Sequence, residues 1–132
     1  MTPTLPDILM GQAVALMTPL PPEAGGDYLV GRMGMLAMLA GLAAQEAERG
    51  PAARVWENEA IRTLLAKAGV ASQMDEGNLA WSALDAANAE LRRALIRLHE
   101  AAEDRGDRAL QSEILELYRQ MAKARRLELS GG

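Results

Sequence analysis

Two asparagines occupy positions that a helical pattern assigns to its apolar face. Each is followed one helical turn later by an arginine: Asn58 by Arg62, and Asn88 by Arg92. A buried amide without a hydrogen-bond partner costs about 1–3 kcal/mol. Three arrangements would give each amide a hydrogen-bond partner. The two amides pair across a helix interface and fix its register, they lie at a solvent-exposed edge, or they form a polar cluster that orients a ligand.

Two tryptophans lie near these amides in the sequence. Trp56 and Trp81 are suited to anchoring an interface, although burial of the indole in the core is the commoner outcome. The candidate ligand-binding or interface residues are therefore Trp56, Asn58, Arg62, Trp81, Asn88 and Arg92.

The residue sets of the common enzyme classes are missing from the sequence. His99 is the single histidine, and Ile96 stands where a di-metal bundle needs the glutamate of a Glu-x-x-His pair. The phosphate-binding, dinucleotide-binding and serine-hydrolase motifs are absent, and there is no cysteine. We therefore predict no catalytic residue, metal or cofactor. An enzyme without a recognisable motif remains an alternative, in which His99 or a buried carboxylate such as Glu57 or Glu59 would act in a cleft.

The elements that would position these residues are predicted to be helices. The chain of 132 residues has no phenylalanine and is rich in Ala, Leu, Met, Glu and Arg, which favour helices over strands. Caps and breakers predict a short N-terminal helix after Thr4 and four main helices in an up-down bundle. The main helices span residues 27–49, 51–68, 79–105 and 107–129, with breaks at Gly50-Pro51, Gly69 and Gly106-Asp107.

Apolar residues recur every three or four positions in the last three of these helices, which indicates one buried face on each. The most apolar run, Met33–Ala44, is expected to be the central buried helix, because twelve residues are too few to span a bilayer. The methionines of this run, with Met10 and Met17, are expected to fill gaps in the core.

We predict a single domain over residues 1–132, with a short helix and Pro/Gly connection at 1–26 and a four-helix core at 27–129. The formal charge of −4 argues against partners such as nucleic acid or an anionic membrane, which attract basic surfaces. The absence of cysteine suits a cytoplasmic protein. The run Met35–Leu65, with its Met-Leu-Ala-Met-Leu-Ala and Glu-Asn-Glu-Ala-Ile-Arg segments, resembles uncharacterised bacterial helical proteins. This resemblance implies a helical bundle and attaches no activity.

The function that best fits the sequence is a non-enzymatic interaction or regulatory module that binds a second copy of itself or another protein. The alternative is a carrier or sensor that holds a small apolar ligand among the helices, with Asn58 or Asn88 orienting it.

Overall fold

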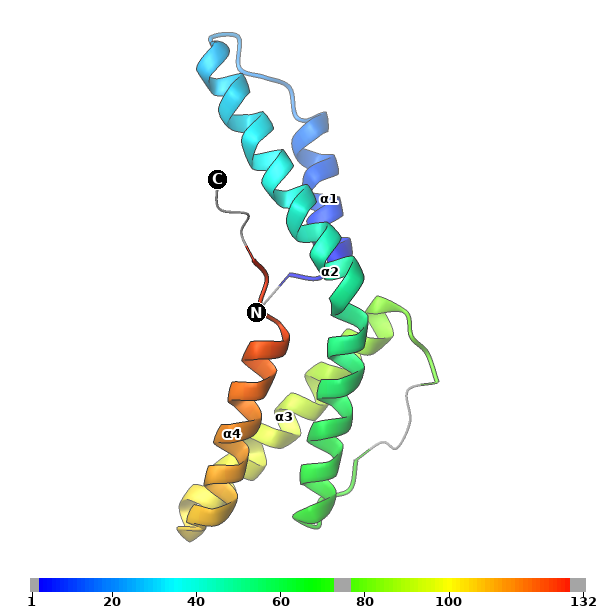
Figure 1. Ribbon diagram of the computed structural model, residues 1–132, viewed down its shortest axis with the longest axis vertical. Coiled ribbons are helices and arrows are strands. Elements are labelled where there is room, and N and C mark those ends of the chain that lie inside the picture. The colour runs from blue at the N-terminus through cyan, green and yellow to red at the C-terminus, as the bar shows by residue number, and fades with distance from the viewer. Residues whose placement is uncertain (1–2, 73–76, 129–132) are drawn as a thin grey trace. The chain divides into compact units, whose positions relative to one another are not determined.

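The computed structural model describes residues 3–72 and 77–128, which form four α-helices and no strand (Figure 1). The helices are α1 (Leu5–Met17), α2 (Gly26–Lys67), α3 (Trp81–Arg105) and α4 (Arg108–Ala124). The predicted all-α class is therefore confirmed, and the helix contacts are consistent with an up-down arrangement. Predictions for residues 73–76 and 129–132 lie outside the described part of the chain.

The chain divides into two compact units. Unit 1 contains the described residues up to Gly50 together with Leu127 and Glu128, and unit 2 contains Pro51–Arg126. The first half of α2 belongs to unit 1 and its second half to unit 2.

The predicted break at Gly50-Pro51 is wrong, because α2 continues through both residues. A proline inside a helix removes one backbone hydrogen bond and crowds the carbonyl four residues earlier. Strong helix formers on both sides, including Ala47, Ala52 and Ala53, offset part of that cost. The helix ends where the sequence predicts: Gly69 has a φ of 77°, a conformation that glycine adopts readily.

Unit 2 contains an apolar core shared by the second half of α2, α3 and α4. The predicted face of α3 is confirmed from Leu84 to Ala102. A tight connection joins α3 to α4: Gly106 is left-handed, with a φ of 65°, and the Asp107 carboxylate accepts a hydrogen bond from the Leu110 amide at 3.1 Å. The core side chains are Ile61, Leu64, Leu65, Leu91, Leu95, Leu98, Ala102, Ile114, Leu117 and Met121.

Unit 1 is built from α1 and the first half of α2. The predicted start of α1 is confirmed: the backbone N–H and the hydroxyl of Thr4 both donate to the Asp7 carboxylate, at 3.0 and 2.8 Å. These bonds, the backbone one first, lower the pKa of Asp7. Two side chains link the helices, because Gln12 donates to the Leu36 carbonyl at 2.8 Å and Arg32 donates to the Thr18 carbonyl at 3.1 Å.

The prediction that Met33–Ala44 is enclosed by neighbouring helices is wrong. In this run Ala43 is buried, whereas Met33, Met35 and Met38 are 69%, 52% and 48% exposed. The physical reason is the small number of helices in unit 1. A pair of helices covers only the side chains that face each other, so the remaining sides of both stay open to solvent.

Candidate functional site

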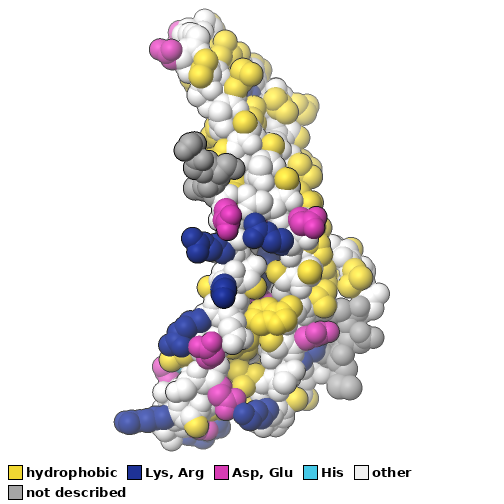
Figure 2. All heavy atoms as spheres, in the orientation of Figure 1, with side chains coloured by type: hydrophobic (Ala, Val, Ile, Leu, Met, Phe, Trp, Pro, Cys, Tyr) yellow, Lys and Arg dark blue, Asp and Glu magenta, His cyan; other side chains and the backbone are white. Residues whose placement is uncertain are grey.

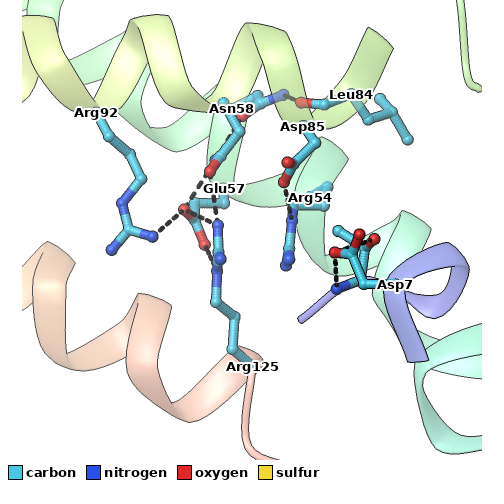
Figure 3. A network of polar contacts seen from close by, with 10 residues as sticks. Asp7, Arg54, Glu57, Asn58, Leu84, Asp85, Arg92 and Arg125 are labelled. Carbon is cyan, nitrogen blue, oxygen red and sulfur yellow. Dashed lines mark hydrogen bonds and ion pairs between the residues drawn. The ribbon is translucent and has the colours of Figure 1, made fainter. Parts of the chain in front are cut away.

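The most concentrated set of buried polar groups lies in unit 2, around the carboxylate of Glu57 (Figure 3). One Glu57 oxygen, Oε1, accepts hydrogen bonds from Asn88 Nδ2 at 2.8 Å and from the Arg125 guanidinium at 2.7 Å. The other oxygen, Oε2, accepts from Arg125 Nε at 2.7 Å. The Arg125 side chain thus forms a two-pronged ion pair with a carboxylate whose side chain is 0% exposed.

The amide of Asn88 connects this ion pair to Asn58. Asn88 Nδ2 donates to Asn58 Oδ1 at 2.8 Å, and Asn88 Oδ1 accepts from Arg125 at 2.6 Å. Asn58 Nδ2 points to the Leu84 carbonyl at 3.5 Å, at the long limit of a hydrogen bond. We call Glu57, Asn58, Asn88 and Arg125 the Glu57 cluster.

Each helix of unit 2 contributes to the Glu57 cluster for a local reason. Glu57 and Asn58 lie one turn before the buried Ile61 on α2, so they share its core-facing side. Asn88 lies between Leu84 and Leu91 on the buried face of α3. Arg125 is the C-cap residue of α4, where a cation also interacts favourably with the helix dipole.

Two further arginines lie beside the cluster. Arg92 NH1 is 3.9 Å from Glu57 Oε1 and is partly open to solvent. Arg54, one turn before Glu57, is 1% exposed; its Nε is 3.6 Å from the Asp85 carboxylate, and its guanidinium lies 5.7 Å from the centre of the Trp81 ring. The buried Glu57 carboxylate therefore lies within ion-pair distance of two cations, Arg125 and Arg92, and Arg54 pairs with Asp85.

The structure places the candidate residues predicted from the sequence in different environments. Asn58 and Asn88 are buried and bonded to each other, which is the first of the three arrangements predicted for them, pairing across a helix interface. Arg92 and Trp81 are half-buried, Arg92 beside Glu57 and Trp81 beside Arg54. Trp56 is exposed at 39%, so the expectation of a buried indole is wrong for Trp56. Arg62 is half-buried on α2.

The two charged members of the Glu57 cluster, Glu57 and Arg125, were not among the predicted site residues. Arg125 lies near the end of a predicted helix, where a basic side chain is ordinarily solvated, and Glu57 was named only as a possible carboxylate of an enzyme. One sequence pattern could have identified Glu57 as a buried charge. An acid and a base lie on the same helical face as an apolar residue, because the residues are spaced by three or four positions: Arg54, Glu57, Asn58 and Ile61. A buried arginine in that pattern requires a partner.

The chemistry of the Glu57 cluster favours structural support over proton transfer. Both carboxylate oxygens accept hydrogen bonds from Arg125, and Asn88 uses both ends of its amide. His99, the other candidate for proton transfer, lies on α3 in tilted contact with the ring of Tyr118, whose pKa is raised by burial. Its Nε2 atom is 3.6 Å from a Glu103 carboxylate oxygen. Among the described residues, no three His, Asp or Glu side chains are grouped to hold a metal ion.

Unit 1 presents a different candidate site, an extensive exposed apolar surface (Figure 2). Twelve of the sixteen large hydrophobic side chains found exposed in the described structure belong to this unit. We call them the unit 1 apolar surface: Leu9, Met10, Val14, Leu16, Met17, Leu20, Tyr28, Leu29, Val30, Met33, Met35 and Met38.

A shallow hollow of about 340 Å³ lies on the α2 side of unit 1. The residues that line it are mostly small and apolar, with two polar residues at one end: Gly34, Ala37, Met38, Gly41, Leu42, Gln45 and Glu128. At the polar end the Gln45 amide bonds both backbone groups of Glu128, donating to its carbonyl at 2.6 Å and accepting from its N–H at 2.8 Å.

By length and composition alone, α2 also meets the requirements for a membrane-crossing helix. Its apolar stretch extends beyond Met33–Ala44, because Arg32 is the only charged residue between Asp27 and Glu46. A soluble core helix passes the same test when it is buried, but only 6% of the most apolar part of α2 is buried.

No family model, no curated protein and no solved structure matches the chain.

Proposed function

We propose that this protein is a non-enzymatic, self-associating helical protein in which unit 1 binds a second copy of the chain. The observation that carries the proposal is the contrast between the two units. Among the residues that the structure describes, unit 2 buries eleven hydrophobic side chains and unit 1 buries two, Ile8 and Ala43.

Unit 1 needs additional coverage for a physical reason. Helices that are apolar on most sides are normally enclosed by other protein or by lipid. Soluble monomers rarely expose a contiguous apolar patch of more than a few hundred Å². Two such helix pairs packed together would create the layered core that a single pair lacks.

A second copy suits unit 1 better than a bilayer does. Residues 1–50 carry two basic and five acidic side chains, so they offer no basic flank for anionic lipid headgroups. Helix α1 has 13 residues, about 20 Å at 1.5 Å per residue, and is too short to cross a hydrocarbon core of about 30 Å. The Arg32 side chain lies within the apolar stretch and is held by the Thr18 carbonyl.

The mass of the protein in solution tests this proposal. Light scattering coupled to size-exclusion chromatography, repeated over a wide range of concentration, is expected to show a dimer or larger species. The paired substitution Val30→Glu and Met33→Glu places charges on α2 at side chains that are 72% and 69% exposed. It should shift the mass to that of the monomer without loss of helicity by circular dichroism.

The matched control is Leu115→Glu, at a side chain on α4 in unit 2 that is 45% exposed and should leave the mass unchanged. A wild-type protein that is monomeric at every concentration overturns the proposal. A second outcome also overturns the proposal. If the protein is monomeric in solution and floats with vesicles of zwitterionic or anionic lipid, unit 1 binds a membrane instead of a second copy.

The alternative of a small apolar ligand oriented by Asn58 or Asn88 has less support. Asn58 Oδ1 and both ends of the Asn88 amide are already bonded to protein groups. A ligand at that place would have to replace bonds that stabilise a buried charge.

A further inference from the structure

We propose that Arg92, together with the hydroxyl of Tyr118, binds the phosphate group of a small molecule on the surface of unit 2. This proposal is independent of the self-association of unit 1, because all of its residues lie in unit 2. Its basis is a positive charge that unit 2 does not neutralise.

The surplus charge arises because two guanidinium groups share the carboxylate of Glu57. Arg125 donates to both carboxylate oxygens at 2.7 Å, and its side chain is 9% exposed. Arg92 Nη1 is 3.9 Å from Oε1, beyond hydrogen-bond distance, and its side chain is 40% exposed (Figure 3). One carboxylate balances one of the two cations. Arg92 is the cation that is left over, and solvent reaches it.

Arg92 also has unused hydrogen-bond donors. A guanidinium carries five N–H donors in a planar fork. In the part of the chain that the structure describes, Arg92 donates no hydrogen bond to a protein group, and Glu57 is its one ion-pair partner. The fork of a guanidinium matches two oxygens of a phosphate or a carboxylate, so Arg92 can bind either group with two parallel hydrogen bonds.

Tyr118, on α4, supplies a further donor beside Arg92. Burial raises the pKa of Tyr118 and the positive charge of Arg92 lowers it, so the two side chains are within electrostatic range of each other. The Tyr118 ring is in tilted contact with His99 of α3, with 5.7 Å between the ring centres, which holds the phenol against that helix. Its hydroxyl bonds to no other residue among those described and can donate to an oxyanion.

The end of α4 adds positive charge to this surface. Lys123 and Arg126 are exposed beside Arg125, and neither is within ion-pair distance of an acid among residues 3–72 and 77–128. Glu128, two residues after Arg126, belongs to unit 1. Several cations around one place raise the local potential and favour an anion of more than one charge. A phosphate group carries about −1.5 to −2 at neutral pH, so it fits better than a carboxylate.

The acids nearest to Arg92 on the two helices do not cancel this charge. They are already paired with other arginines: Glu90 with Arg93, and Glu116 with Arg119. Glu100 lies eight residues after Arg92, which is about 12 Å along the axis of α3. The positive charge at Arg92 is therefore available to a ligand.

Isothermal titration calorimetry at constant ionic strength tests the site with two probes, inorganic phosphate and phenyl phosphate. We expect saturable binding of one anion per chain. Arg92→Gln should weaken it by about tenfold or more, because the charge and the fork are both lost. Arg92→Lys should cause a smaller loss, since it keeps the charge. Tyr118→Phe should weaken binding several-fold and leave the core packing intact.

The matched control is Arg97→Gln, which removes an exposed cation from the same helix and should change the affinity by less than about twofold. Circular dichroism verifies that each variant is folded. Binding of both probes assigns the site to the phosphate group itself, and binding of phenyl phosphate alone assigns it to an organic phosphate. The site is overturned if neither probe binds saturably, or if Arg97→Gln and Arg92→Gln weaken binding equally.

Discussion

At the scale of the residue, the molecule is organised by a charge placed inside an apolar core. Taking an ion pair out of water is expensive, and the cost is recovered only when geometry and additional hydrogen bonds are good. The Glu57 cluster meets this condition through the two-pronged Arg125 contact and the Asn88 amide. Removal of one partner should therefore cost far more than removal of a surface ion pair.

We expect Glu57→Gln to lower the free energy of unfolding by about 3–5 kcal/mol, because Arg125 loses its counter-charge. In addition, the N–H₂ group of the glutamine would replace an oxygen that accepts hydrogen bonds from Asn88 or Arg125. Urea denaturation followed by circular dichroism measures the change. The control is Glu90→Gln, since Glu90 forms an exposed ion pair with Arg93 and should change stability by less than about 1 kcal/mol. Equal effects of the two substitutions would show that the buried pair has no special role.

The residues of the Glu57 cluster were only partly predictable. Asn58 and Asn88 were identifiable because an amide on an apolar stripe requires a partner, and they are each other's partners. Arg125 was not, because a basic residue near the end of a helix is ordinarily solvated. Its role depends on which helix end approaches Glu57, and periodicity does not contain that information.

At the scale of the element, the length of α2 is the main departure from the prediction. Glycine followed by proline normally ends one helix and begins another, yet α2 continues for 42 residues. The local signal was interpreted wrongly as the end of one helix and the start of another. Residues after Pro51 are held in helical register by their own burial, as Arg54, Glu57 and Ile61 show. The stops at Gly69 and Gly106 were predictable because glycine adopts a positive φ there.

We expect Pro51→Ala to raise the free energy of unfolding by up to about 3 kcal/mol, since alanine restores the missing N–H and removes the clash of the ring. Thermal and urea denaturation check this. Pro21→Ala, outside the helices, is the control and should have a smaller effect. A clear loss of stability in Pro51→Ala would mean that the proline maintains a bend that the fold requires.

At the scale of the whole molecule, the core could be predicted in one unit and not in the other. The stripes of α3 and α4 give the core of unit 2 directly, because amphipathic helices bury their apolar sides. The run Met33–Ala44 is apolar on nearly all sides, and such a pattern indicates that burial is needed without stating whether the same chain provides it. For this reason the apolar pattern of Met33–Ala44 did not predict that these side chains are exposed in the single chain.

The stability of unit 1 should consequently depend on protein concentration. If a second copy completes its core, mass action raises the melting temperature of the wild-type protein as concentration increases. Circular dichroism melts over a dilution series measure this. The Val30→Glu, Met33→Glu variant should melt at a temperature independent of concentration, and the same independence in the wild type would contradict the expectation.

The contact between Arg125 and Glu57 also bears on the order in which the chain folds. It joins residues separated by 68 positions, whereas α3 and α4 are connected by a tight turn at Gly106. Local contacts form faster than distant ones, because closing a long loop costs more entropy. The α3–α4 hairpin should therefore form early in folding. The second half of α2 should pack onto it later, when Glu57 forms its contact with Arg125 and completes the core of unit 2.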